Sequence, residues 1–219
     1  MKIKSVSECA FLIDGKLATL NLAKGQRVYG EELIIHEGRE YRLWNPYRSK
    51  LAAAIMKGMR HIELRRGDNV LYLGAATGTT SSHISDMVGS EGTVYCVEIS
   101  ERSMRDLLRV CEARENMLPM LKDAMDAMAY SDEVGTVDVI YQDVAAKDQA
   151  EILLRNSELL KSGGIAYVAI KSQSISISRA PSEVYGEFLE KVSRRFEILE
   201  RIDIEPYDSL HLFVVLRKR

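Results

Sequence analysis

Residues 69–89, NVLYLGAATGTTSSHISDMVG, carry the clearest structural signal in this chain. A short apolar run ends at Leu73, a turn of glycine, alanine and threonine follows, and a helical pattern begins near Thr80. An apolar run of this length suits a strand that is buried on both faces, as in a parallel sheet. The order of strand, small-residue turn and helix therefore predicts a β-α unit in which backbone amides at the start of the helix face a bound ligand.

Strand-like and helical segments alternate through the rest of the chain. Strands are expected at 70–74, 93–99, 117–121, 136–143 and 164–171, and helices at 45–59, 81–88, 100–113, 147–161 and 181–196. Two last apolar runs, at 196–207 and 210–218, are expected to form an antiparallel pair. This alternation predicts the α/β class, with a doubly wound, seven-stranded, mostly parallel sheet and helices on both faces.

Residues 1–44 have a different pattern, because their short apolar runs show no helical periodicity. Dipeptides that favour turns separate these runs at Asp14-Gly15, Lys24-Gly25 and Glu37-Gly38. Asp-Gly between apolar runs is a typical hairpin signal. We therefore predict two domains: a small antiparallel β domain over 1–44 and a Rossmann-like domain over 45–219, whose first helix has Pro46 in its first turn.

The composition limits the classes of function. The chain has 219 residues and a net charge of −2, and no apolar stretch is long enough to span a membrane. Cys9, Cys96 and Cys111 are not spaced as metal ligands, so no metal site is predicted, and their odd number indicates a reducing, cytoplasmic location. A protein that alone holds a nucleic acid is usually basic, so affinity for RNA would have to come largely from another molecule.

The turn and the following strand ends indicate a nucleoside ligand. The turn lacks the GxGxxG of dinucleotide sites and the lysine of a P-loop, and its small residues suit close approach of the methionine part of S-adenosylmethionine. Glu98 ends the second strand, where a carboxylate accepts hydrogen bonds from two ribose hydroxyls. Asp123 follows the third strand, within reach of an adenine amino group, and Asp143 ends the fourth, beside the methionyl end.

The chain closely resembles fibrillarin, the methyltransferase of box C/D ribonucleoproteins. The resemblance lies in WNPYRSKLAAAI (44–55), VLYLGAATGTTSSHISDMVG (70–89), YCVEIS (95–100) and IYQDVAAKDQ (140–149). It continues through GGIAYVAIKSQSI (163–175) to IEPYDSLH (204–211), and the first string is far more specific than the nucleotide turn. Because the Gly/Arg-rich tail of eukaryotic members is missing, the chain resembles the compact archaeal form.

The resemblance implies a role for individual residues. The family's proposed catalytic group corresponds to Lys50, Asp143, Lys171 and His211. The cofactor contacts correspond to Gly74, Ala75, Thr79, Thr80, Glu98, Ile99, Asp123, Ala124, Asp143 and Gln149. Two positions depart from the family's pattern, and neither is expected to abolish activity. Ile99 replaces a phenylalanine that can stack on adenine, so an aliphatic contact is expected there, and Ala146-Lys147 replaces a glutamine.

The activity implied by the resemblance is methyl transfer from S-adenosylmethionine to ribose 2′-hydroxyls of rRNA, with tRNA as a further target. The implied partners are a Nop-domain scaffold protein, a kink-turn-binding protein and a guide RNA that selects the target. A lysine beside the hydroxyl can polarise it or accept its proton, and Asp143 could hold Lys50 and Lys171 in place. The sequence does not say which lysine is the base. His83 is expected to be packed rather than catalytic.

Three other functions stay open. The first is a stand-alone methyltransferase for RNA, or for a small molecule or a protein, and the latter acceptors would not need two lysines for activation. The second is a non-catalytic scaffold subunit, which would not need the intact Asp143 and lysines. The third is a nicotinamide dehydrogenase, which the missing middle glycine of the turn disfavours.

Overall fold

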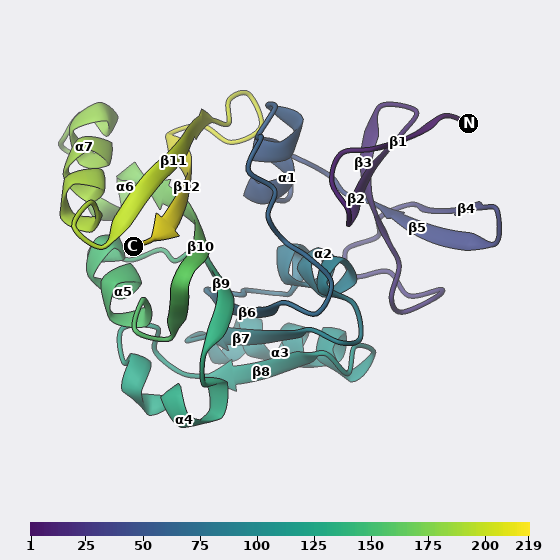
Figure 1. Ribbon diagram of the computed structural model, residues 1–219, viewed down its shortest axis with the longest axis horizontal. Helices are drawn as coiled ribbons and strands as arrows, with labels where there is room; N and C mark the ends of the chain where they lie inside the picture. Colours follow the sequence, from purple (N-terminus) through teal and green to yellow (C-terminus); the bar gives the residue numbers. More distant parts are fainter.

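A computed structural model describes all residues, 1–219, and contains two β-sheets (Figure 1). The larger sheet has seven strands in the order β11-β12-β10-β9-β6-β7-β8. They are β6 (Asn69–Leu73), β7 (Thr93–Glu98), β8 (Met117–Leu121), β9 (Val137–Gln142), β10 (Leu160–Lys171), β11 (Phe196–Asp203) and β12 (His211–Lys218). Only β12 runs antiparallel to its neighbours, which are β10 and β11. The predicted seven-stranded, mostly parallel sheet with a C-terminal antiparallel pair is confirmed.

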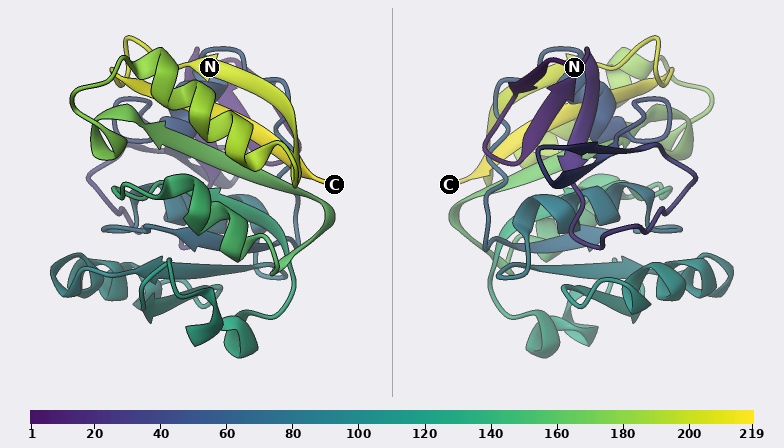
Figure 2. Two further views of the ribbon diagram at one scale, coloured as in Figure 1. Left: turned by 90° about the vertical axis from the view of Figure 1, so that its left-hand side faces the viewer. Right: turned by 90° about the vertical axis from the view of Figure 1, so that its right-hand side faces the viewer.

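Helices cover both faces of this sheet, as Figure 2 shows. They are α1 (Lys50–Met56), α2 (Thr79–Val88), α3 (Glu101–Glu112), α4 (Ser131–Val134), α5 (Gln149–Asn156), α6 (Ser172–Ile175) and α7 (Pro181–Val192), with a 3-10 turn η1 (Ala127–Ala129). Along β6, Val70 and Tyr72 join the core under α1, α2 and α3, whereas Leu71 and Leu73 join the core under α5 and α7. The strand is therefore buried on both faces. No helix has both the length and the apolar character needed to cross a bilayer.

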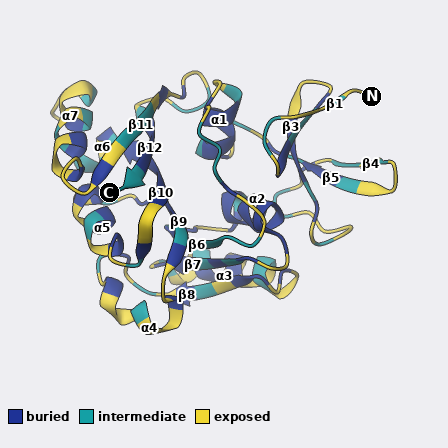
Figure 3. Cartoon of the chain, in the orientation of Figure 1, coloured by how far each residue is buried: buried dark blue, intermediate teal, exposed yellow.

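The N-terminal sheet has five strands in the order β1-β2-β3-β5-β4, all paired antiparallel. They are β1 (Ile3–Ser5), β2 (Ala10–Ile13), β3 (Lys16–Leu20), β4 (Leu33–His36) and β5 (Arg39–Leu43). Asp14-Gly15 and Glu37-Gly38 have positive φ at both residues, as a tight two-residue hairpin turn requires. This confirms the predicted antiparallel fold. Strand β3 packs against α2. The tip of the β4–β5 hairpin is exposed, as Figure 3 shows.

Helix α1 is shorter than the helix predicted over 45–59. Ser49 has extended backbone and accepts a hydrogen bond from the N–H three residues further on at 3.3 Å, which makes it the cap of the helix. Asn45 forms a separate turn, in which its side chain accepts the N–H two residues further on at 2.9 Å. Pro46 therefore lies in this turn and not in the first helical turn, and Lys50 is the first residue of the helix.

Strand β10 is longer than the run predicted at 164–171, and the helix predicted over 147–161 ends correspondingly early, at Asn156. The pairing of β10 with β9 shifts register between Leu160 and Ile165. Gly164 lies in this bulge, where a Cβ would be 2.9 Å from a main-chain oxygen of β9. Because the bulge takes up the extra residues, Leu160 can still pair with β9, and β10 extends beyond the predicted run.

Candidate active site

The charged side chains of the predicted catalytic group lie at one edge of the larger sheet. Glu98 ends β7, Asp143 follows β9 and Lys171 ends β10, all at the carboxyl ends of parallel strands. Ligands of open parallel sheets bind at this edge. The antiparallel strand β12 begins there with His211, which is the register partner of Lys171. Lys50 reaches the same edge from the start of α1.

Asp143 lies between the two lysines. Its Oδ2 is 3.1 Å from Lys50 Nζ, and its Oδ1 is 2.7 Å from Lys171 Nζ. The contact with Lys171 is an ion pair, and the same ammonium donates a hydrogen bond to the Asp143 main-chain oxygen at 2.8 Å. The three side chains are 14–18% exposed, so they are shielded but still reach solvent. One carboxylate thus holds two cations together at the edge of the sheet.

Asp208 extends this group and was missed by the sequence analysis. Its Oδ2 lies 3.5 Å from Lys50 Nζ, and its Oδ1 lies 2.9 Å from His211 Nδ1. The same ring nitrogen is 2.7 Å from the main-chain oxygen of Ser209, so the loop before β12 holds the imidazole. The basic and acidic side chains alternate in the order Lys171, Asp143, Lys50, Asp208 and His211. An acid three residues before the histidine in IEPYDSLH was the available signal.

The turn after β6 has no room for a larger residue at its start. Gly74 has a φ of +81°, and a Cβ there would lie 2.9 Å from the Asp143 main-chain oxygen. Both the conformation and the close approach therefore require glycine. Ala75 is buried, and Thr79 begins α2 directly after Gly78. The first N–H groups of α2 are thereby placed at the same edge as Asp143.

Glu98 retains the capacity to bind a ribose. Its Oε2 accepts the Ala76 N–H and its Oε1 accepts the Ser100 N–H, each at 2.8 Å. An ionised carboxylate has about four acceptor positions, so two of them stay available for hydroxyl donors. The two backbone bonds also fix the side chain, which is only 8% exposed.

The surface beyond Glu98 suits a flat apolar ring. Ile99 is 67% exposed at the end of β7. Asp123 follows the neighbouring strand β8, and one of its oxygens accepts the Met125 N–H at 2.8 Å. Its other oxygen makes no hydrogen bond within the chain, so it can accept an amino group. Ala124 is buried next to it.

Thr80 and Gln149 make contacts within the protein. The Thr80 hydroxyl donates to Ser49 Oγ at 3.0 Å and so ties α2 to the cap of α1. Gln149 is completely buried: its Oε1 accepts the Lys171 N–H at 3.1 Å, and its Nε2 donates to the Ala146 main-chain oxygen at 3.1 Å. The Gln149 amide therefore bonds to main-chain atoms of Ala146 and of Lys171, at the carboxyl end of β10.

His83, on α2, is buried and links the two sheets. Its Nδ1 lies 2.8 Å from Thr19 Oγ1, and its Nε2 lies 2.8 Å from the Tyr29 hydroxyl. Thr19 donates its only hydroxyl proton to Asp86 at 2.8 Å, because a carboxylate can only accept. His83 Nδ1–H therefore donates to Thr19, and in a neutral ring Nε2 is the acceptor for the Tyr29 hydroxyl, which also lies 3.1 Å from the Leu43 main-chain oxygen. His83 is packed, as expected.

Buried charges surround this histidine. Asp86 lies 2.8 Å from one Arg42 nitrogen and 2.6 Å from an Arg114 nitrogen, and Arg42 also pairs with Glu31 at 2.6 Å. Burial, followed by the two guanidinium charges, holds the pKa of His83 well below its ordinary value of 6.5. The ring is thus neutral at ordinary pH.

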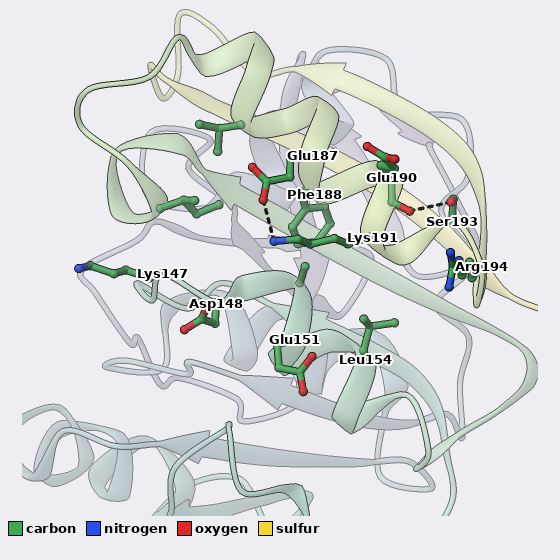
Figure 4. A pocket seen from close by; sticks show the side chains of 13 residues that line it. Lys147, Asp148, Glu151, Leu154, Glu187, Phe188, Glu190, Lys191, Ser193 and Arg194 are labelled. Carbon is green, nitrogen blue, oxygen red and sulfur yellow. Dashed lines mark hydrogen bonds and ion pairs between the residues drawn. The ribbon is translucent and has the colours of Figure 1, made fainter.

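A large cavity lies away from the catalytic group. It has a volume of about 850 Å³ and opens between α5 and α7 (Figure 4). Acidic and basic side chains alternate on its walls, and Glu187 and Lys191 pair across 2.7 Å. None of the residues predicted to be catalytic or to bind a cofactor lines it. We therefore identify it as a groove between helices and not as the reaction site.

The strand order, the glycine turn after β6 and the acids after the next strands define a class I S-adenosylmethionine-dependent methyltransferase. Within this class, the cluster of Lys50, Asp143 and Lys171 is the feature that distinguishes this site. The model of one family, Fibrillarin, matches residues 2–219, and the chain belongs to the fibrillarin family.

Known relatives agree in sequence and in structure. A Pyrococcus abyssi protein described as a fibrillarin-like rRNA/tRNA 2′-O-methyltransferase is 48% identical over 204 residues, which cover 93% of this chain and 90% of the relative. The Methanococcus jannaschii fibrillarin pre-rRNA processing protein has a TM-score of 0.95 at 42% identity and covers 99% of this chain and 97% of its own. The Aeropyrum pernix fibrillarin, solved with natively bound S-adenosyl-L-methionine, has a TM-score of 0.89 at 41% identity and covers 99% of both chains. A fibrillarin solved in complex with Nop5p has a TM-score of 0.88 at 40% identity and covers 96% of this chain and 97% of its own.

Proposed function

We propose that this chain transfers a methyl group from S-adenosylmethionine to ribose 2′-hydroxyls of rRNA and tRNA, as the catalytic subunit of a guide-RNA-directed box C/D ribonucleoprotein. The observation that carries the proposal is the pair of lysines held around Asp143, directly beside the turn that begins at Gly74. An alcohol is a poor nucleophile while protonated, so it needs such basic groups more than an amine or a carboxylate does. The activity named for the Pyrococcus abyssi relative supports the proposal.

The residues at the sheet edge fit S-adenosylmethionine. Glu98 has two acceptor positions for the ribose hydroxyls, and Ile99 and Asp123 present an apolar surface and a free carboxylate oxygen for adenine. The methionyl end would lie between the Gly74 turn and Asp143. When bound, this cofactor supplies a methyl group on a sulfonium, which leaves as a thioether and needs no acid. The Aeropyrum pernix fibrillarin with bound S-adenosyl-L-methionine supports this assignment.

The side chains of the cluster have to accept one proton and align one oxygen. In our proposal, Lys50 or Lys171 in its amine form takes the proton of the 2′-hydroxyl as the oxygen bonds to the methyl carbon and the carbon–sulfur bond breaks. Asp143 holds both amines at the acceptor, and Asp208 with His211 holds Lys50 from the other side. The remaining acceleration comes from alignment of sulfur, methyl carbon and oxygen.

The charge of the chain supports delivery by a partner. A net charge of −2 gives little general attraction for a polyanion, and proteins that bind phosphate backbones gain affinity mainly by releasing counterions. We propose that a Nop-domain scaffold protein docks on the N-terminal sheet and nearby helices, and the fibrillarin–Nop5p complex supports such a partner. A kink-turn-binding protein and a guide RNA would complete the assembly, which we place in the cytoplasm. Transfer then becomes effectively intramolecular.

A reconstitution tests the proposal. The purified chain is incubated with methyl-labelled S-adenosylmethionine and target RNA, alone and with scaffold, kink-turn protein and guide RNA. We expect negligible transfer by the isolated chain and efficient transfer by the complete assembly, which is lost again when the guide is omitted. Efficient methylation by the isolated chain without a guide would contradict the proposal and favour a stand-alone RNA methyltransferase.

A further inference from the structure

A second cavity, of about 350 Å³, adjoins the cofactor turn and is rich in arginine. Thr77 and Thr79 of the turn line it on one side. The arginines that line it come from three separate segments and are Arg27, Arg48, Arg109 and Arg114. Asp106 is the only acidic residue on its walls. In a chain whose overall charge is −2, this is a local concentration of positive charge.

Only two of these arginines are free to bind an anion. Arg109 and Arg114 already pair with carboxylates, at 3.0 Å and 2.6 Å. Arg27 and Arg48 are exposed, and neither has a carboxylate within 4.0 Å. Arg27 uses only its Nε, which donates to a main-chain oxygen at 3.0 Å. Two guanidinium groups therefore face the solvent at the cavity without a counter-charge.

Arg48 is held in place by an aromatic ring. Its guanidinium carbon lies 5.4 Å from the centre of the Tyr29 ring, which is within cation–π distance. The Tyr29 hydroxyl is 2.8 Å from Nε2 of the buried His83. Burial raises the pKa of Tyr29 to about 12, so this hydroxyl keeps its proton for the bond. A guanidinium stacked on a fixed ring is preoriented and keeps its N–H groups available for a ligand.

The cavity is lined by residues that adjoin the proposed active site along the chain. Arg48 is two residues before Lys50, and Thr79 is the first residue of α2. A ribose whose 2′-hydroxyl reaches the lysine cluster belongs to a strand with a phosphate on each side of it. Two exposed guanidinium groups match this repeating charge, since arginine binds phosphate through charge-assisted, often bidentate hydrogen bonds.

We propose that Arg27 and Arg48 form a cradle for backbone phosphates of the target RNA strand, beside the nucleotide that is methylated. This inference rests on the proposed function and adds a substrate-binding surface to it. The cofactor has a single carboxylate, which would neutralise only one of the two arginines. The site proposed for the cofactor as a whole is at the sheet edge, beside Glu98 and Asp143. The cradle contacts no base, so it positions the strand without selecting a sequence.

The test compares two double variants that remove the same charge. Arg27→Gln/Arg48→Gln alters the cradle, whereas Arg194→Gln/Arg201→Gln removes two exposed arginines, one just after α7 and one on β11. Each is assembled with scaffold, kink-turn protein and guide, and the Kd for a target RNA with shortened guide pairing is measured without cofactor over a range of salt. We expect the cradle variant to weaken binding roughly tenfold. The slope of log Kd against log salt should fall by about 1.4, because each phosphate on a single strand contributes about 0.7. The matched control should keep the wild-type Kd and slope.

Three results would overturn the cradle. The first is the same Kd and slope in the cradle variant as in wild type. The second is a loss of S-adenosylmethionine affinity in calorimetric titration of the cradle variant, which would assign the cavity to the cofactor. The third is a loss of scaffold binding in the absence of RNA, which would assign it to a protein partner. RNA binding is measured without cofactor, so this test does not depend on activity. A wild-type complex that binds RNA but transfers no methyl group would contradict the proposed function, and the comparison of Kd values would still test the cradle.

Discussion

At the scale of single residues, the chemistry depends on a carboxylate that serves two cations. Asp143 fixes Lys171 at 2.7 Å and Lys50 at 3.1 Å, on opposite oxygens. The two lysines are not equivalent, however. Lys171 also donates to the Asp143 main-chain oxygen at 2.8 Å, whereas Lys50 shares a second carboxylate, Asp208, at 3.5 Å. The two lysines thus have different partners, and separate substitutions can distinguish their roles.

We predict that Lys50→Ala and Lys171→Ala retain cofactor affinity but impair methyl transfer. The variant that lacks the proton acceptor should slow single-turnover transfer by about two to four orders of magnitude. The lysine that only orients the substrate should have the smaller effect. Lys191→Ala, at an exposed lysine on α7, is the control and should match wild type. Near-normal rates in both cluster variants would show that neither lysine activates the hydroxyl.

The residues at the site could be predicted unequally well from the sequence. Asp143 and Lys171 end strands, and the carboxyl ends of parallel strands must meet at one edge of the sheet. Asp208 could not be placed in this way, because its contact with Lys50 depends on where the loop before the antiparallel β12 folds. Gln149 was matched to a cofactor contact by resemblance alone. In the structure its amide bonds to the backbone at the end of β10.

At the scale of elements, the turn after β6 should be intolerant of any side chain at its first residue. We predict that Gly74→Ala destabilises the chain and abolishes cofactor binding. The new Cβ would lie 2.9 Å from the Asp143 main-chain oxygen and would push that backbone away. Gly15→Ala is a matched control, since Gly15 has a φ of +84° but no atom within 4 Å of a built Cβ. The control should cost only the conformational strain, about 1–2 kcal/mol in the free energy of unfolding.

Chemical denaturation and calorimetric titration of both glycine variants check this prediction. Equal losses of stability for the two variants, with cofactor affinity intact in Gly74→Ala, would show that the close approach to Asp143 is unimportant.

Elements with a strong period were predicted, and irregular ones were not. The five parallel strands, α2, α3 and α7 have enough residues for their apolar pattern to appear. Helices α4 and α6 have four residues each, and β1 has three, which is too short for any period. The extent of α1 was wrong because side-chain caps at Asn45 and Ser49 compete with helical hydrogen bonds.

At the scale of the whole molecule, a buried polar network joins the N-terminal sheet to α2. Arg42 on β5 pairs with Asp86 on α2, and Glu31, in the loop between β3 and β4, pairs with Arg42. Such contacts could not be predicted, because a buried charge gives no periodic signal and its partner lies far away in the sequence. Removing one member would leave uncompensated charge, which typically costs about 3–5 kcal/mol.

The neutral His83 in this network makes stability depend on pH. The pKa of His83 in the folded chain is well below 6.5. As the pH falls below 6.5, His83 therefore binds a proton in the unfolded chain but not in the folded chain. We therefore predict that the free energy of unfolding falls by about 1.4 kcal/mol for each pH unit below this value. Urea denaturation between about pH 8 and pH 5 measures this loss. The buried Glu31 does not interfere in this range, because its pKa is lowered from an ordinary value of 4.5 and it therefore affects stability only at more acidic pH.

His83→Gln should be less stable than wild type at neutral pH but should lose less stability on acidification. His36→Gln, at the end of β4 in the N-terminal sheet, controls for the loss of a histidine. The same acid dependence in His83→Gln as in wild type would contradict the role given to the buried ring.

The central claim is that the lysine and aspartate cluster methylates a ribose 2′-hydroxyl that a guide RNA has selected. The most direct measurement is mass spectrometry of the nuclease fragments and of the nucleosides from a target RNA, after incubation of the reconstituted complex with S-adenosylmethionine. We predict one added methyl group, on the ribose of the guide-selected nucleotide, and none with the Lys50→Ala/Lys171→Ala chain in the same complex. A methyl group on a base, methylation outside the guide-paired segment, or undiminished ribose methylation by the double variant would contradict the account.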